Sequence, residues 1–250
     1  MSILSKEEEK YIVSLQRKFS KTIQDYQLIA DGDVILVGLS GGKDSLALLE
    51  LLGERKKIHK PAFSVIAAYI SLDNMEYTSD VKYLQQFCDN YAIPFVHRVG
   101  SFDASTDKRK SPCFLCSWTR RKKLFDIAKE FGCNKIALGH HQDDMLETLL
   151  MNMSFQGAFS TMPPILKMNK FEMSIIRPMC LLTEQELLKL STIRQYKTQA
   201  KNCPYEKDSY RTNMKEMLAT LEKLNPAIRS SMWNAMSNIQ LEYLPQKKEK

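Results

Sequence analysis

The sequence predicts an α/β protein built around a parallel sheet, and three observations support this class. Short apolar segments rich in β-branched residues alternate with longer amphipathic segments along most of the chain. The 250 residues, 44% hydrophobic and 26% charged, have the composition of a globular protein with a substantial core. A strand, a small-residue loop and a helix follow one another directly near residue 40. Such alternation favours right-handed crossovers between parallel strands.

Each expected element follows from its periodicity and its flanking turn residues. An N-terminal helix over residues 6–28 carries Tyr11, Leu15 and Phe19 at helical spacing, and Asp31-Gly32-Asp33 ends it. The same reasoning predicts strands at 34–38, 63–70, 94–99, 135–138 and 174–176, and helices at 77–91, 112–131, from about 143, 183–196, 209–224 and 227–241. We expect an N-terminal helix (1–30), an α/β domain (31–200) and a C-terminal helical extension (201–250).

The first strand leads into a loop that is suited to binding an anion. Ser40-Gly41-Gly42-Lys43-Asp44-Ser45 follows an apolar strand and precedes an apolar helix. Glycines let the backbone approach a phosphate, and the free N–H groups of a helix start point at it. The spacing is that of neither a Walker A loop nor a Gly-x-Gly-x-x-Gly loop. As a unit it resembles the PP-loop of ATP pyrophosphatases, which implies that Ser40 to Ser45 hold pyrophosphate; an ordinary Gly-Gly turn is the alternative.

Charge and hydropathy limit the partners and the location. The formal net charge is +7, and basic residues cluster at 108–110 and at 120–123. These clusters permit an acidic partner such as RNA, although either alone is also typical of a solvated face. No apolar run is long enough to cross a membrane, and the N-terminus is polar, so we expect no membrane association and a cytoplasmic protein.

Two of the six cysteines lie where thiolates are favoured. Ser111 suits an N-cap and Pro112 a first helical position, so Cys113 and Cys116 share one face of a helix start. The helix dipole and nearby cations stabilise thiolates there. Cys88, Cys133 and Cys180 lie in apolar surroundings and are expected to be buried, whereas Cys203 lies in a polar turn.

The residues alone leave three interpretations of Cys113, Cys116 and Cys203. They hold an iron–sulfur cluster with one iron lacking a protein thiolate, or they hold zinc, or the first two form a redox dithiol. A zinc site would need a fourth ligand such as His97, His140 or His141.

A second polar segment follows the expected strand at 135–138. Gly139 and His140 lie at its carboxyl end, where ligands bind in parallel sheets. Asp44 with Asp143 or Asp144 offers oxygen ligands for Mg2+, while N-capping of the next helix is the alternative for Asp143 and Asp144. His140 and His141 either contact nucleotide or pack. Arg120, one turn beyond Cys116, either stabilises phosphate charge near an activated base or belongs to a solvated surface.

Taken together, the motifs resemble those of the tRNA 2-thiocytidine synthetase family (TtcA), within the TtcA/TtuA group of tRNA thiolation enzymes. The resemblance runs from about residue 30 to residue 240. The segments that carry it are Ser40–Ser45, Cys113-x-x-Cys116, Ile136–Asp144, Glu147–Met153, Met162-Pro163-Pro164, Ile176-Arg177-Pro178, Cys203 and Lys215–Leu218.

The resemblance implies a PP-loop Rossmann-type fold (adenine nucleotide alpha hydrolase-like) and an ATP- and Mg2+-dependent reaction. Sulfur replaces the C2 oxygen of cytidine 32 in the tRNA anticodon loop after adenylylation. It further implies a [4Fe–4S] cluster on Cys113, Cys116 and Cys203, and a cysteine desulfurase as sulfur source. The catalytic residues that we expect are Asp44, Asp143, Cys113, Cys116 and Arg120. A homodimer is compatible with it. Relatives often carry a second distal Cys-x-x-Cys, whereas this chain has Glu206 at the corresponding position, which is a weak oxygen ligand or simply exposed.

Two other functions compete with this one. A 2-thiouridine synthetase of the TtuA type shares the PP-loop, but those relatives typically carry extra terminal Cys-x-x-Cys modules. A non-catalytic nucleotide- and RNA-binding module with structural zinc is the alternative from another class. The intact Ser40–Ser45 loop together with Asp143 and Asp144 disfavours that module.

Overall fold

The computed structural model describes residues 4–73, 80–101, 112–169, 172–198 and 210–245. By its internal contacts the chain divides into two compact units. The first comprises Met1–Gln142 with Pro163–Lys207, and the second comprises Asp143–Met162 with Asp208–Lys250.

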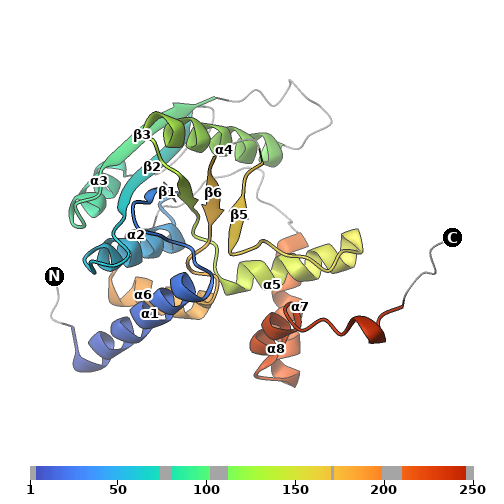
Figure 1. The fold of residues 1–250 in the computed structure, drawn as a ribbon. Coiled ribbons are helices and arrows are strands. Elements are labelled where there is room, and N and C mark those ends of the chain that lie inside the picture. The colour runs from blue at the N-terminus through green and yellow to red at the C-terminus, as the bar shows by residue number, and fades with distance from the viewer. Residues whose placement is uncertain (1–3, 74–79, 102–111, 170–171, 199–209, 246–250) are drawn as a thin grey trace. The chain divides into compact units, whose positions relative to one another are not determined.

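The first unit is built on a six-stranded sheet with the strand order β3-β2-β1-β4-β6-β5 (Figure 1). All neighbouring strands are parallel except β5, which is antiparallel to β6. The strands are β1 (Val34–Leu39), β2 (Ser64–Leu72), β3 (Phe95–Gly100), β4 (Lys135–Ala137), β5 (Ile165–Lys167) and β6 (Ser174–Ile176).

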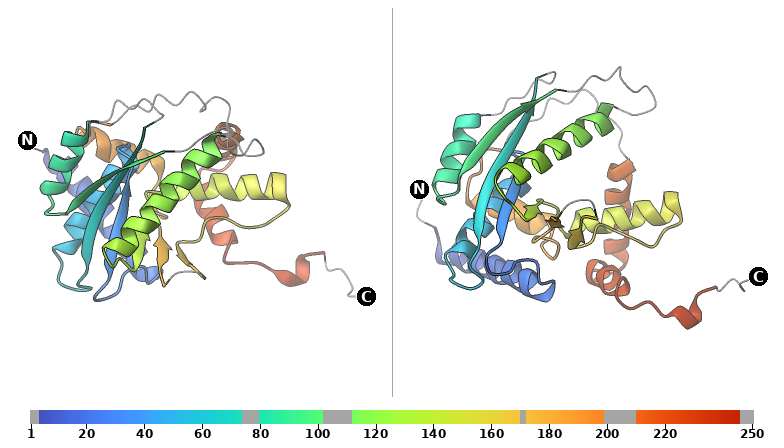
Figure 2. Two further views of the ribbon diagram at one scale, coloured as in Figure 1. Left: turned by 90° about the horizontal axis from the view of Figure 1, so that it is seen from above. Right: turned by 45° about the horizontal axis from the view of Figure 1, so that its top comes forward.

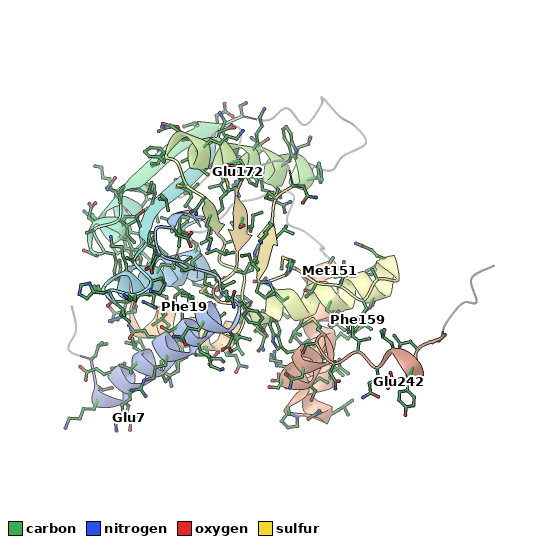
Figure 3. The ribbon with its side chains drawn as sticks, in the orientation of Figure 1. Glu7, Phe19, Met151, Phe159, Glu172 and Glu242 are labelled. Carbon is green, nitrogen blue, oxygen red and sulfur yellow. The ribbon has the colours of Figure 1, made fainter. Side chains whose placement is uncertain are left out.

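Helices cover both faces of this sheet, and each face has its own apolar core. On one face lie α1 (Lys6–Asp25), α2 (Lys43–Lys56), α3 (Val81–Asp89) and α6 (Glu184–Ile193). Phe19 of α1, labelled in Figure 3, is 1% exposed in the core of that face. The other face packs against α4 (Pro112–Glu130), as Figure 2 shows. Ile127 and Ala128 of this helix are buried there. Burial on both faces explains why the central strands are almost continuously apolar.

Local sequence signals set where these helices begin. Ser5 and Glu8 form a capping box at the start of α1, and Thr183 and Glu186 form one at the start of α6. Asp80 caps α3 by accepting a hydrogen bond from the Tyr83 N–H.

The connections of β1 and β4 place the loops that follow them beside each other. From β1 the chain proceeds to β2 and β3 on one side, and it returns to β4 on the other side of β1. The carboxyl ends of β1 and β4 are therefore adjacent at the point where the strand order reverses, which is where open α/β sheets bind ligands.

The second unit is helical. It contains α5 (Gln142–Met151) from Asp143 on, a π-helical segment (Asn152–Gln156), α7 (Tyr210–Leu224) and α8 (Ile228–Ala235). Leu146 and Leu150 of α5 pack with Met214 and Leu218 of α7 to form its small core. Beyond α8 the structure has a 3-10 turn at Leu241–Tyr243.

The expected α/β class and parallel sheet are confirmed, with two corrections. The sequence prediction missed β5, so the sheet is only mostly parallel. The helix expected over 227–241 ends at Ala235, because Ser237 and Asn238 form turns with carbonyls of the preceding residues instead. Within the described part of the chain, every helix is too short or too polar to cross a membrane.

Candidate functional site

The loop between β1 and α2 has a preorganised backbone that is suited to binding an anion. Gly41 has φ +80°, a conformation that side chains disfavour, and Gly42 is the N-cap of α2. The Ser45 hydroxyl donates to the Gly42 carbonyl at 3.0 Å and accepts from the Ser40 N–H at 3.1 Å. The Ser40 hydroxyl in turn accepts from the Gly42 N–H at 3.3 Å. These bonds fix the loop around the N-terminus of α2, where backbone donors favour negative charge.

Lys43 and Asp44 are the charged groups of this loop. The Lys43 ammonium lies 2.9 Å from Asp44 Oδ1 and 3.7 Å from Glu184 Oε1, at the start of α6. One ammonium thus faces two carboxylates. The sequence prediction included Lys43 and Asp44 but missed Glu184, because its partner lies on a distant helix.

The lack of a side chain at Gly139 lets the chain after β4 pass close to this loop. A Cβ atom on Gly139 would lie 3.2 Å from the Asp44 carbonyl carbon and 3.3 Å from the Ser45 nitrogen. The backbone of the β4 end therefore touches the backbone of the loop. This contact brings together the two predicted nucleotide-binding segments, 40–45 and 139–140.

A cavity of about 180 Å³ opens beside the loop. This is far more than the order of 15 Å³ that one water needs, so a ring-sized group fits. It is lined by Gly38, Leu39 and Ser40 at the end of β1, by Ala68, Tyr69 and Ile70 of β2, by Arg120 and Leu124 of α4, and by Leu138. The lining is mainly apolar, with a guanidinium as its cationic group, which suits a flat base next to a phosphate.

Arg177 joins two further segments that the sequence singled out. This arginine, 6% exposed, donates from Nη1 to the Pro163 carbonyl at 2.6 Å and from Nε to His140 Nδ1 at 3.3 Å. Burial, with repulsion from Arg121, lowers the pKa of Arg177. Because Nδ1 of His140 accepts, the neutral imidazole carries its proton on Nε2. His140 is thereby oriented by Arg177, while His141 is 6% exposed and packed.

Asp143 and Asp144 lie in the second unit, in the first turn of α5. The helix begins at Gln142, so Asp143 and Asp144 lie inside its first turn and neither is its N-cap, which was the alternative to Mg2+ binding. Asp143 is 4% exposed, and its Oδ1 accepts from Nε of Arg229 at 2.9 Å. Arg229 also pairs with Glu222, and these hydrogen bonds raise its pKa against the opposing effect of burial. Asp143 is thus held by an arginine that the sequence prediction did not identify.

The cysteines separate into two groups. Cys88, Cys133 and Cys180 are at most 5% exposed, which confirms the prediction that they are buried. Burial raises the pKa of the thiols of Cys88 and Cys180 to about 12 and that of Cys133 to about 11. Cys116 is only partly buried, on a helix that begins at Pro112 as predicted and also contains Cys113. Cys203 and Glu206 lie outside the described residues.

His97 and the two basic clusters are the remaining features that the sequence singled out. His97, which we predicted as a possible zinc ligand, lies on β3. Its Nε2 is hydrogen-bonded to the Ser71 hydroxyl at 2.8 Å, and its ring is tilted against the Tyr69 ring with centroids 5.3 Å apart. Of the basic cluster 120–123, Arg120 lines the cavity, whereas Arg121 and Lys122 are exposed. The cluster 108–110 and the N-cap Ser111 lie outside the described residues.

Comparison with known proteins agrees with this geometry. The model of the PP-loop domain family matches residues 12–218. A tRNA-cytidine(32) 2-sulfurtransferase of Aliivibrio salmonicida is 36% identical, over 96% of this chain and 80% of that protein. One from Geotalea uraniireducens is 31% identical, over 95% and 96% of the two chains.

A solved structure is also similar. The U34-tRNA thiolase NcsA from Methanococcus maripaludis, determined with its [4Fe-4S] cluster, superimposes with a TM-score of 0.77 at 28% identity. The match covers 96% of this chain and 84% of NcsA. The chain therefore belongs to the PP-loop domain family and, within it, to the family of the tRNA-cytidine(32) 2-sulfurtransferases.

Proposed function

We propose that this protein is an ATP-dependent tRNA sulfurtransferase that replaces the C2 oxygen of cytidine 32 by sulfur. The observation that carries the proposal is the junction of the Ser40–Ser45 loop with the cavity that Arg120 lines. Arg120 belongs to α4, the helix that begins with Cys113 and Cys116. A phosphate-binding loop and a thiol pair are thus linked through one helix.

The reaction needs activation because the C2 oxygen of cytidine is a poor leaving group. In the first step this oxygen attacks the α-phosphorus of ATP, the bond to the bridging oxygen breaks, and pyrophosphate leaves. In the second step sulfide attacks C2 and AMP leaves with the original oxygen, so no net oxidation or reduction occurs. The protein therefore has to bind pyrophosphate, orient the α-phosphate and supply sulfide.

Residues of the loop perform the first of these tasks. The N–H groups around Gly41, Gly42 and Lys43 bind the departing pyrophosphate, and the Lys43 ammonium neutralises its charge. The apolar cavity takes the adenine ring, and the Arg120 guanidinium stabilises charge on the transferring phosphorus. Gly139 and His140 border the nucleotide from the end of β4.

For Mg2+ we propose Asp44 and Asp144 as ligands. Carboxylate oxygens suit this hard cation, which bridges phosphates. Asp143 forms an ion pair with Arg229, and we propose a positioning role for it.

Cys113, Cys116 and Cys203 are the proposed ligands of a [4Fe–4S] cluster. The chemistry of the donor set fits, because Cys116 is partly exposed on a helix start that favours thiolates, and the three buried cysteines are unsuited. When bound, such a cluster supplies an iron without a protein thiolate to which sulfide can bind. Glu206 is not needed for three-thiolate ligation.

The partners follow from the reaction. The tRNA anticodon loop is the substrate, and we propose a cysteine desulfurase as the source of sulfur, a homodimer as the working form and the cytoplasm as its location. NcsA, with its U34 specificity, makes 2-thiouridine formation the second candidate.

Nucleoside mass spectrometry of tRNA tests the proposal. A host without its own 2-thiocytidine activity would express the intact chain, the Cys116→Ser variant or the Cys180→Ser variant. We expect 2-thiocytidine with the intact chain and with Cys180→Ser, and none with Cys116→Ser. A product that is 2-thiouridine would establish the second candidate instead, and thiolation by Cys116→Ser would remove that thiol from the reaction.

A further inference from the structure

The outward face of α4 carries aromatic and cationic side chains together. Phe114 is 48% exposed and Trp118 is 54% exposed. They lie one helical turn apart, about 6 Å along the axis. Arg121 and Lys122 are exposed on the next turn, and the Lys122 ammonium lies 5.5 Å from the centre of the Trp118 ring. Two rings and two cations therefore form one stripe, termed here the aromatic stripe.

The opposite face of the same helix is built into the protein. Thr119, Ile127 and Ala128 are buried, and Arg120 and Leu124 line the cavity beside the phosphate-binding loop. A Cβ atom on Gly38 of β1 would lie 3.3 Å from Leu124, so α4 packs closely on the sheet. Because these contacts hold the helix from Thr119 to Ala128, they fix the direction in which Trp118, Arg121 and Lys122 face relative to the cavity.

We propose that the aromatic stripe binds single-stranded RNA, with unpaired bases stacked on Phe114 and Trp118 and phosphates contacting Arg121 and Lys122. This inference deepens the proposed function and rests on it: the RNA is the unpaired part of the tRNA anticodon loop. Single-stranded RNA is recognised by stacking on aromatic rings combined with cations that follow the backbone.

The composition of the stripe favours RNA over a protein partner. A helix face that docks on a protein groove carries apolar anchors at positions i, i+3, i+4 and i+7. Here the positions after Phe114 are Ser117, Trp118 and Arg121, so one anchor position is a hydroxyl and another a cation. A cation above the indole ring complements the negative phosphate that accompanies each stacked base.

Fluorescence offers a direct test, because the chain has two tryptophans. Trp233 packs against the small core of the second unit, and replacing it by phenylalanine leaves Trp118 as the single reporter. The full-length Trp233→Phe protein would be titrated with a synthetic anticodon stem-loop containing cytidine 32, and with an RNA duplex of equal length. We expect the stem-loop to quench Trp118 emission and the duplex to leave it nearly unchanged. If both RNAs quenched Trp118 equally, or if neither quenched it, the proposed stacking of bases on Trp118 would be wrong.

Binding measurements on variants provide a second test that does not depend on the reporter. Trp118→Ala should bind the labelled stem-loop about tenfold more weakly, within the range expected for one base stacked on an aromatic ring, whereas Trp118→Phe should retain most of the affinity. Phe131→Ala is the matched control, because Phe131 is also an exposed aromatic residue, 40% exposed, beyond the far end of α4. All variants should bind ATP as the intact chain does. Unchanged RNA affinity in Trp118→Ala would refute the proposal.

The two proposals fail in different ways. If the intact chain forms 2-thiocytidine but Trp118→Ala binds and thiolates tRNA normally, the aromatic stripe is wrong and the proposed function stands. If the stem-loop quenches Trp118 but no thionucleoside forms, the RNA surface stands and the proposed reaction is wrong.

Discussion

Glu50 is a buried carboxylate that interrupts the apolar run of residues 46–52 in α2. It is 1% exposed, and its two oxygens accept hydrogen bonds of 2.8 Å from Arg194 Nε and from the Tyr196 hydroxyl. Burial, followed by the charge of Glu50, raises the pKa of Tyr196 and keeps its hydroxyl a donor. The three residues connect α2 to the end of α6.

Removing the Tyr196 hydroxyl tests this network. Tyr196→Phe removes one hydrogen-bond donor of the buried Glu50 carboxylate, which costs about 1–3 kcal/mol of unfolding free energy. Chemical denaturation and a thermal scan would measure the loss. Tyr243→Phe is the control, since Tyr243 is 79% exposed and should change nothing. Equal stability of the two variants would show that the Tyr196 bond contributes nothing.

The buried thiols predict a pattern of cysteine reactivity. Since burial raises the pKa of Cys88, Cys133 and Cys180 to about 11 or 12, about one thiol in a thousand or fewer is ionised at pH 8. In the metal-free folded protein, iodoacetamide should modify Cys116 well before these three, as peptide mass spectrometry would record. A buried thiol that reacts as fast as Cys116 would contradict the packing.

The same shifts predict how stability depends on pH. Thiols in the unfolded chain ionise near pH 9, whereas the three buried thiols stay protonated in the folded chain until about pH 11 to 12. The folded state therefore binds more protons in this window, and stability falls as the pH rises above about 9. Denaturation midpoints between pH 7 and 10.5 would measure the fall, and Cys180→Ala should reduce it.

At the scale of single residues, the sequence predicts those features that are set by residues close together in the chain. The Ser40–Ser45 loop and the helix start at Pro112 are local patterns and were predicted correctly. Glu50 and Arg194 are 144 residues apart, and no periodicity relates them. Glu184 and Arg229 were missed for the same reason, because ion pairs are set by tertiary contact.

At the scale of elements, the close approach of β4 to the phosphate-binding loop yields a sharper test. In Gly139→Ala the new methyl group would meet the backbone of Asp44 and Ser45, which cannot rotate away. The loop must shift, so we expect ATP affinity to fall at least tenfold while the protein stays folded. Equilibrium binding of ATP and circular dichroism would separate these two effects.

Gly100→Ala is the matched control for this substitution. Its Cβ would approach side-chain methyl groups of Leu72 and Thr119, at 3.1 and 3.4 Å, instead of the loop. A small loss of stability with normal ATP affinity is expected. If both variants bound ATP normally, the backbone contact at Gly139 would have no influence on the nucleotide site.

The element that the sequence concealed is β5. Its three residues, Ile165–Lys167, follow Pro163 and Pro164 and are too few to show alternation. It forms by pairing antiparallel with β6, and Arg177, just after β6, donates its backbone N–H to the Pro164 carbonyl at 2.8 Å. Short edge strands of this kind are determined by their partners and not by their own propensity.

At the scale of the whole molecule, the second unit depends on the pairing of Arg229 with Asp143 and Glu222. Arg229→Met removes the guanidinium that pairs with the nearly buried Asp143 carboxylate, and breaking a buried pair in this way typically costs about 3–5 kcal/mol. Limited proteolysis should then cut within α7 and α8 before the sheet domain. Lys223→Met, which removes an exposed cation of α7, should leave the digestion pattern unchanged. Identical digestion of the two variants would show that the pair does not hold these helices.

The overall organisation could be predicted only in part. Alternation of strands and helices indicates a parallel sheet, but strand order depends on which connections cross the sheet, and periodicity carries no such information. Likewise, the second unit combines residues 143–162 with residues 208–250. The composition of each segment taken alone does not predict that these two segments belong to one unit. The sequence did predict the edge of the sheet at which residues 40–45 and 139–140 lie side by side.

The Lys43 ammonium that faces two carboxylates has a consequence for nucleotide selection. A bare triphosphate that approaches this loop competes with Asp44 and Glu184 for a single cation and brings more negative charge beside them. A triphosphate that brought a divalent cation would supply positive charge for the carboxylates of Asp44 and Glu184 when its phosphates bind the Lys43 ammonium. These three side chains would therefore favour the metal-loaded form of the nucleotide.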